Sequence, residues 1–301
     1  IPQKKGDPLL IATDQEGGWV TRLKGATILP GNMALGATDS AELAEQAGEM
    51  TAIELAAVGI NLNFAPVMDV NVNPRNPVID RRSFGESPEL VSCLGIAYIR
   101  GLKRNGVLAT AKHFPGHGDT TVDSHTALPT VKHDLTRIQA VELKPFRAAI
   151  DAGVAAIMTA HILYSALDAN RPATLSPPIL TNLLRKELGF DGVVITDDME
   201  MKAIDSHYHA GEAAVMAIEA GADIVLALWT PAKKIEVYNA LLAAAKKGRI
   251  STARLDQSVK RILKSKQACV AFDRRFVDVD AVSAIVGQDD HKQLAQTIAS
   301  Q

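Results

Sequence analysis

The stretch GFDGVVITDDME, residues 189–200, decides the fold class because it spans the boundary between a helix and a strand. Gly189 follows a segment with helical spacing, and glycine is favoured where a helix ends in a left-handed residue. The next residues, 192–198, are almost wholly apolar until they end in Asp197 and Asp198. Such a run is typical of a strand that is buried on both faces of a parallel sheet. We therefore predict a β/α protein whose strands end in polar groups.

The same pattern recurs along the chain. Apolar runs predict strands at residues 8–14, 60–69, 107–114, 154–161, 192–198 and 222–228. Segments with helical spacing lie at residues 40–58, 88–105, 136–152, 177–188, 211–221 and 231–247. Repeated parallel β/α units favour a (β/α)8 TIM-type barrel, with a doubly wound open sheet as the alternative. No G-x-G-x-x-G follows a strand, which weakens the dinucleotide-binding form of the open sheet.

Composition excludes several classes of partner. The 301 residues include 32 Lys and Arg against 34 Asp and Glu, a net charge of −2 without a basic block, so we expect no nucleic acid partner. No apolar run is long enough to predict a membrane span. Cys93 and Cys269 lack a CxxC partner, so neither a thiolate metal site nor a disulfide framework is indicated. We expect no cofactor and no metal.

Titratable side chains stand at the ends of five consecutive predicted strands. They are Asp14, Asp69, Lys112 with His113, His161, and Asp197 with Asp198. Barrel enzymes gather their chemistry at the carboxyl ends of their strands, so we expect these groups around one pocket. Any single one of them could instead be a helix cap or part of a loop ion pair.

The residue types suggest separate roles. Asp14 can accept hydrogen bonds from sugar hydroxyls, and Arg22 can meet an anionic or acetamido group. Arg82, in the loop after a strand, is either a substrate clamp or half of an ion pair that pins the loop. Asp197 is the candidate nucleophile, while Asp198 points to a helix start; alternatively, both carboxylates cap that helix.

The end of the third predicted strand and the loop after it carry three histidines. It reads KHFPGHGDTTVDSH, residues 112–125. Asp123 and His125 are two residues apart, so an extended backbone places them on one side and the carboxylate can hold the imidazole. A histidine held in this way can act first as a general acid and then as a general base. The alternative is a solvated loop with incidental histidines.

These segments resemble the glycoside hydrolase family 3 β-N-acetylglucosaminidases of the cell-wall recycling type. The resemblance covers about residues 8–265 and lies in IATDQEGG, INLNFAPVMDV, DRRSFG, KHFPGHGDT with the downstream DSH, and GVVITDDMEM. It implies that Asp197 is the nucleophile and that Asp123 and His125 form an acid/base dyad. The implied binders of the N-acetylglucosamine unit are Asp14, Arg22, Arg82, Lys112, His113 and His161.

The resemblance implies a retaining exo-β-N-acetylglucosaminidase that acts on peptidoglycan fragments or chito-oligosaccharides through a covalent glycosyl–aspartate. One alternative is a phosphorylase with the same residues, in which phosphate replaces water. Another is a metal-dependent hydrolase built on His113, His117, Asp119 and His125, although Pro115 and Gly116 break any helix there. A non-catalytic sugar-binding protein fits least well. The family implies a cytoplasmic location for a single-domain recycling enzyme and an extracytoplasmic one for a two-domain form.

The two ends of the chain depart from the family. Only seven residues precede the strand that ends in DQEGG, where the family has a further strand and helix. We therefore expect a TIM-type barrel that lacks its first strand and helix in this chain, formed by residues 1–270. Residues 271–301 are expected to be a C-terminal tail or linker helix, with HKQLAQTIASQ as its amphipathic part. The natural protein is expected to extend beyond both ends.

Overall fold

The computed structural model describes residues 8–269 and 276–301. Six strands form one parallel sheet in the order β1-β4-β5-β7-β9-β10, which is also their order in the chain. Their bounds are β1 Ala12–Thr13, β4 Leu62–Asn63, β5 Leu108–Phe114, β7 Ala156–Thr159, β9 Val193–Asp198 and β10 Ile224–Leu226. Each lies within one of the six predicted strands. The prediction of consecutive β/α units is therefore confirmed.

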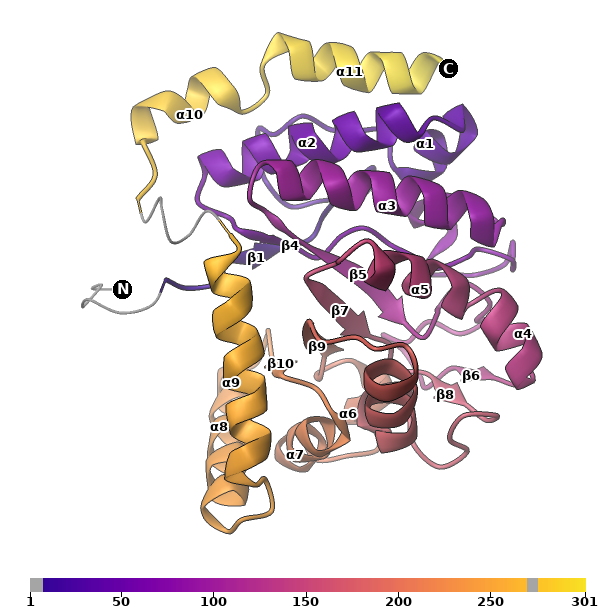
Figure 1. Ribbon diagram of the computed structural model, residues 1–301, viewed down its shortest axis with the longest axis vertical. Helices are drawn as coiled ribbons and strands as arrows, with labels where there is room; N and C mark the ends of the chain where they lie inside the picture. Colours follow the sequence, from indigo (N-terminus) through magenta and orange to yellow (C-terminus); the bar gives the residue numbers. More distant parts are fainter. Residues whose placement is uncertain (1–7, 270–275) are drawn as a thin grey trace.

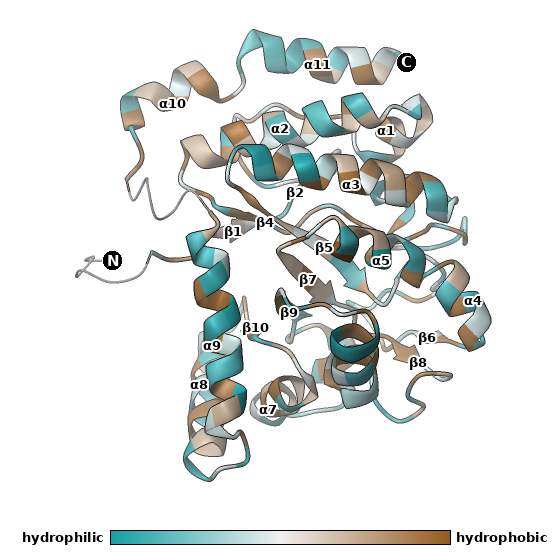
Figure 2. Ribbon diagram, viewed as in Figure 1, coloured by the Kyte–Doolittle hydropathy of each residue, from teal (hydrophilic) through white to brown (hydrophobic). Residues whose placement is uncertain are grey.

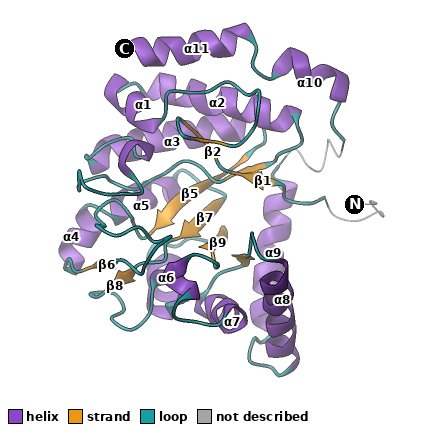
Figure 3. Cartoon of the chain, turned by 180° about the vertical axis from the view of Figure 1, so that it is seen from behind, coloured by secondary structure: helices purple, strands orange, loops and turns teal. Residues whose placement is uncertain are grey.

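Helices surround this sheet, as Figures 1 and 3 show. The main ones are α1 Asn32–Thr38, α2 Ala41–Ala57, α3 Pro88–Arg104, α4 Leu135–Ala140, α5 Leu143–Asp151, η3 Pro178–Glu187, α6 Lys202–Asp205, α7 Ala210–Ala220, α8 Pro231–Lys246, α9 Thr252–Gln267, α10 Val279–Ile285 and α11 Asp289–Ser300. Helices such as α3 and α9 are banded with hydrophilic and hydrophobic residues in Figure 2, as amphipathic helices are. The short elements are β2 Gln15–Gly17, β3 Val20–Thr21, β6 Thr130–Val131, β8 Leu163–Tyr164, η1 Asp80–Arg82 and η2 Ala173–Leu175.

One segment predicted to be a single helix is divided into two helices. Residues 136–152 form two helices, α4 and α5, with a break at Val141, whose backbone N–H bonds to the carbonyl of Arg137. Glu142, the next residue, is buried, and its carboxylate accepts a hydrogen bond from the Arg137 guanidinium. Arg137 and Glu142 thus pair across the break between the two helices. The spacing of apolar residues does not reveal a contact between two charged side chains.

Two glycines allow α2 and α3 to pack closely. A Cβ atom at Gly101 would lie 2.1 Å from the backbone oxygen of Glu45, and one at Gly48 would lie 2.3 Å from that of Tyr98. Both distances are far below a normal contact, so a larger side chain would force the helices apart. This layer covers one side of the sheet near β4 and β5 (Figure 1).

The C-terminal residues fold back onto this layer. Helix α11 falls within the segment predicted to be an amphipathic helix, and it lies beside α1 and α2 (Figure 1). The Nδ1 atom of His291 lies 2.7 Å from Oε1 of Glu54 in α2, and Ile298 is buried in the main core. Residues 276–301 are therefore packed onto the α/β body.

The fold is an α/β fold with a curled parallel sheet, consistent with a partial TIM-type barrel. The sheet has six strands in residues 8–269, with β1 and β10 at its edges. None of the helices in the described ranges has the length and apolar character needed to cross a bilayer.

Candidate active site

A cavity of 530 Å³ lies at the carboxyl ends of the strands. Asp14 follows β1, Lys112 and His113 lie in β5, and Asp197 lies near the end of β9. The titratable residues that line the cavity are Asp14, Glu16, Arg22, Arg82, Lys112, His113, His117, Asp123, His125, Asp197, Asp198, Glu200 and Lys202. Residues from five separate segments of the chain therefore meet at one end of the sheet.

One wall of the cavity is a network of charged side chains centred on the buried Lys112. Its Nζ atom lies 2.7 Å from Oδ1 of Asp14 and 2.5 Å from Oε1 of Glu16. Arg82 binds the same Glu16 carboxylate in a bidentate way, with both N···O distances 2.9 Å. Its Nη2 atom also lies 3.4 Å from Nε2 of His113. We call the side chains of Asp14, Glu16, Arg82, Lys112 and His113 the charged wall.

These ion pairs keep Glu16 and Lys112 charged although both are buried. Burial alone would raise the pKa of Glu16, but Lys112 and Arg82 outweigh it and lower that pKa to about 2. Burial alone would lower the pKa of Lys112, but the carboxylates of Glu16 and Asp14 raise it instead. Both partners therefore stay charged at neutral pH. The wall presents fixed cations and anions, which suits the binding of several hydroxyl groups.

Asp69 supports the wall from beneath. Its Oδ2 atom lies 2.7 Å from Nδ1 of His113. Its Oδ1 atom accepts the backbone N–H groups of His113 at 3.1 Å and of His117 at 2.7 Å. Asp69 is completely buried and does not line the cavity. It fixes the histidine ring and the start of the loop after β5 together.

Asp197 is a further carboxylate that lines the cavity, near the end of β9. Burial opposes its ionisation, but the side chains of His113 and His161, the amide of Asp198 and the ammonium of Lys112 hold its pKa below the ordinary value. The Asp198 backbone N–H donates to Oδ1 of Asp197 at 2.8 Å. An ionised, oriented carboxylate at this position can act as a nucleophile.

Asp198 and His161 fix the backbone around Asp197. The Oδ1 atom of Asp198 accepts the backbone N–H groups of Glu200 and Leu228, both at 3.3 Å, and burial raises the pKa of its carboxyl group. His161 is buried, and its ring nitrogens lie 2.8 Å from Oγ1 of Thr174 and 3.0 Å from the Asp198 carbonyl oxygen. His161 lies below the cavity surface and does not line the cavity.

Asp123 and His125 pair on the loop that covers the cavity. The Oδ1 atom of Asp123 lies 2.8 Å from Nδ1 of His125 and accepts the backbone N–H of His125 at the same distance. The side chain of His125 is 62% exposed and that of Asp123 is 32% exposed. Nδ1 thus faces a carboxylate, and both residues line the cavity. Arg22 also lines the cavity and is exposed.

Sequence comparison places the chain in a family. Residues 2–265 match the N-terminal domain of glycosyl hydrolase family 3. The chain belongs to glycosyl hydrolase family 3. All of the residues that line the cavity, from Asp14 to Trp229, lie within the matched range.

Individual known proteins are similar over nearly the whole chain. The chain is 41% identical to β-hexosaminidase A of Pseudoalteromonas piscicida, over 97% of its own length and 52% of that protein. It superposes on a family 3 β-N-acetylglucosaminidase from Paenibacillus sp. str. FPU-7 with a TM-score of 0.94 and 51% identity, covering 97% of this chain and 56% of that one. It also superposes on the β-glucoside phosphorylase BglX with a TM-score of 0.91 and 30% identity, covering 97% of this chain and 54% of that one. The chain thus spans about half the length of these relatives.

Sequence reasoning missed Glu16, although it quoted the motif that contains it. Glu16 lies two residues after Asp14, so an extended backbone sends both side chains to the same side. That spacing could have indicated it. Its two cationic partners come from remote segments of this family 3 chain, and no local pattern reveals them. Glu200 was also missed; its carboxylate accepts the backbone N–H groups of Trp229 and Thr230 at 2.8 and 2.9 Å and shapes the rim of the cavity.

The ligand set of the alternative metal-dependent hydrolase is not assembled, because its four members do not come together in the described residues. The Asp119 carboxylate hydrogen-bonds to His133, away from the cavity, and His117 uses its two ring nitrogens on Thr120 and Ser124. The groups with ligand atoms close together in the described residues are those of Asp119, His133 and Glu142. Arg137 lies among them, with Nη2 3.6 Å from Asp119 and 3.4 Å from Glu142, and already supplies positive charge.

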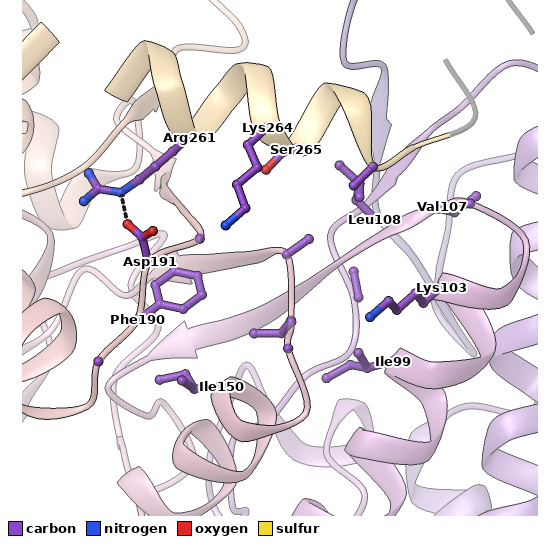
Figure 4. A pocket seen from close by; sticks show the side chains of 18 residues that line it. Ile99, Lys103, Val107, Leu108, Ile150, Phe190, Asp191, Arg261, Lys264 and Ser265 are labelled. Atoms are coloured by element: carbon purple, nitrogen blue, oxygen red, sulfur yellow. Dashed lines mark hydrogen bonds and ion pairs between the residues drawn. The ribbon is translucent and has the colours of Figure 1, made fainter. Parts of the chain in front are cut away.

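A second cavity, of 340 Å³, lies at the opposite end of the sheet (Figure 4). Apolar side chains such as Ile99, Ile150 and Phe190 line it, and Arg261 of α9 pairs with Asp191 at 3.0 Å on its edge. Barrel enzymes place their chemistry at the carboxyl ends of the strands, where the first cavity lies. This position and lining separate the second cavity from the candidate active site.

Proposed function

We propose that this chain carries the catalytic centre of a retaining exo-β-N-acetylglucosaminidase. The observation that carries this proposal is the juxtaposition of an ionised Asp197 and the Asp123–His125 pair at one cavity. A nucleophilic carboxylate and a separate acid/base group are the two components that a retaining glycosidase needs. The names of the relatives, β-hexosaminidase and β-N-acetylglucosaminidase, support the choice of sugar.

In the first step, Asp197 attacks the anomeric carbon of the terminal sugar. The bond from that carbon to the glycosidic oxygen breaks, and protonated His125 gives its Nε2 proton to the departing oxygen. A glycosyl ester on Asp197 results, and the imidazole becomes neutral. Asp123, bonded to Nδ1, stabilises the imidazolium before the transfer and keeps the Nδ1–H tautomer after it.

In the second step, neutral His125 takes a proton from water as the water oxygen attacks the same carbon. The ester bond to Asp197 breaks, the carboxylate is restored, and the sugar leaves with its original configuration. His125 is then protonated again. Each step uses only water and the side chains named, so the cycle closes without a cofactor.

The charged wall is the proposed binding site of the terminal sugar. Asp14 and Lys112 offer an acceptor and a donor to neighbouring hydroxyls, and Arg82 and His113 stand beside them. Arg22 at the rim is proposed to meet the acetamido group. His161 is proposed to act indirectly, by orienting the segment that carries Asp197. A short ligand such as a peptidoglycan fragment or a chito-oligosaccharide fits a cavity of 530 Å³.

Phosphorolysis is the second candidate function. One similar structure is that of a β-glucoside phosphorylase. Because the acid/base group is an imidazole and not a second carboxylate, an attacking phosphate would meet less charge repulsion. In that case phosphate would replace water in the second step and release a sugar 1-phosphate.

One assay tests both candidates on the natural protein. Release of nitrophenol from the aryl β-N-acetylglucosaminide is compared with release from the aryl β-glucoside, each with and without phosphate. We expect turnover of the N-acetylglucosaminide that does not need phosphate and yields free sugar. A phosphate requirement with sugar 1-phosphate as the product would replace hydrolysis by phosphorolysis, and preference for the glucoside would contradict the proposed substrate.

We also infer that the six-stranded sheet is part of a (β/α)8 barrel. Its support is that the strands follow one another in chain order and that the site lies at their carboxyl ends.

A further inference from the structure

The proposed acid/base dyad has few attachments of its own. Within the described part of the chain, the hydrogen bonds of the Asp123 carboxylate run to the backbone and ring of His125. The Asp123 carbonyl accepts only the nearby groups of Thr126 and Ala127 that form the turn. Both dyad side chains are partly or largely exposed. Acid catalysis needs His125 at hydrogen-bond distance from the glycosidic oxygen, so some other contact must set the position of the loop.

Ser124, the residue between the two dyad members, provides that contact. Unlike its neighbours, it is buried, with 2% of its surface exposed. Its Oγ atom lies 3.0 Å from Nε2 of His117, and its carbonyl oxygen accepts the backbone N–H of Ala203 at 3.2 Å. Ala203 belongs to α6, which follows the strand that carries Asp197. Ser124 therefore joins the loop that carries Asp123 and His125, which we call the dyad loop, to the segment of the proposed nucleophile.

His117 in turn is fixed to the base of the charged wall. Its backbone N–H donates to Asp69 at 2.7 Å, and its Nδ1 atom lies 2.9 Å from Oγ1 of Thr120. Burial and the neighbouring His113 lower the pKa of the His117 imidazole to about 4, so the ring is neutral at neutral pH. A neutral ring with both nitrogens occupied is a structural connection and is not available for proton transfer to substrate.

We infer that Ser124, held by His117, is a positioning residue that sets where the His125 imidazole stands relative to the sugar's leaving oxygen. The connection runs from Asp69 through His117 to Ser124, so one buried carboxylate orients both the sugar-binding His113 and the dyad loop. This inference rests on the proposed function, because it gives Ser124 a role only if His125 donates the proton.

The test is Ser124→Ala in the natural protein, assayed on two aryl β-N-acetylglucosaminides. One has a good leaving group, dinitrophenol, and the other has a poor one, unsubstituted phenol. Protonation matters only for the poor one, so we expect kcat/KM to fall by about tenfold or more for the phenyl substrate and by less than about threefold for the dinitrophenyl substrate. Ser124→Thr, which keeps the hydroxyl, should recover most of the loss. Thr121→Ala, an exposed change in the same loop, is the matched control.

The outcomes are distinct. Equal losses on both substrates, or no loss on either, would overturn the positioning role of Ser124. His117→Gln, in which an amide can still reach the serine, should follow the same leaving-group pattern in a milder form; equal losses on both substrates in this variant would also contradict the inference. The assay of His125→Ala separates the two levels of the argument. If His125→Ala loses the same activity on both substrates, the proposed function fails. If His125→Ala loses more on the phenyl substrate and Ser124→Ala does not, only the inference about Ser124 fails.

Discussion

The charged wall and the dyad loop line the same cavity but differ in burial and in how firmly their charges are held. In the wall, Lys112 and Glu16 are almost fully buried, with side chains 2% and 1% exposed, and each is held by at least two opposite charges. In the loop, the His125 side chain is 62% exposed and pairs with the Asp123 carboxylate. A sugar-binding surface gains from fixed charges that need no reorganisation. An acid/base group must gain and lose a proton in every cycle, and contact with solvent makes this possible.

The largest effect is expected at the carboxylate that faces both regions. Asp197→Ala should lower kcat by roughly 10⁴-fold, because no covalent intermediate can form. Asp198→Asn should retain much more activity, since Asp198 binds the backbone of residues 200 and 228. Steady-state assays of the two variants measure the contrast. An inactive Asp198 variant beside an active Asp197 variant would reverse the assignment.

Breaking the charged wall should cost stability as well as activity. Glu16→Ala leaves Lys112 and Arg82 buried without their shared carboxylate, which typically costs about 3–5 kcal/mol. Urea unfolding of the variant and the natural protein gives this difference. The matched change in the loop, Asp123→Ala, should alter the free energy of unfolding by less than about 1 kcal/mol, because its pair is exposed. Similar losses in both variants would remove the distinction between the two regions.

Changes in the dyad loop should instead lower the rate of hydrolysis. His125→Ala should slow hydrolysis of substrates with poor leaving groups by roughly 10²-fold, and that of substrates with good ones far less. Asp123→Ala should behave as a weaker version, because the imidazole loses its orienting partner. A plot of log kcat/KM against leaving-group pKa measures both variants. Parallel lines for natural protein and His125→Ala would mean that this histidine is not the acid.

The strands and the residues at their ends could be predicted from the sequence, because a buried strand appears as an apolar run and the polar residue that ends it is next in the chain. The strand run ending in Asp197 and the DSH spacing both survive in the structure. The ion pairs of Glu16 were not predictable, since its partners lie 66 and 96 residues away in the chain. The structural use of His117 was also hidden: a histidine in a polar loop has the same sequence pattern whether it binds a metal or a serine. Helix α9 was not predicted, because its many charged residues mask its apolar positions.

A further expected effect concerns acid stability. The pKa of Glu16 is about 2 in the folded protein and 4.5 without its partners, so folding favours its ionised form. The resulting stability is fully present above about pH 4.5 and is lost as the pH falls towards 2. The natural protein should therefore lose more stability than Glu16→Gln across this window, by on the order of 3 kcal/mol. Thermal unfolding of both at several pH values measures this, and parallel curves would show that Glu16 is not held ionised by the wall.

The covalent bond that we propose between Asp197 and the sugar can be tested by trapping the intermediate. The natural protein is incubated with a fluorinated N-acetylglucosaminyl fluoride, which forms the glycosyl ester but releases it slowly, and is then digested for peptide mass spectrometry. We expect one sugar adduct on the peptide that contains residues 193–198, located at Asp197 by fragmentation. An active protein that carries no adduct, and whose first sugar product has the inverted configuration, would contradict it.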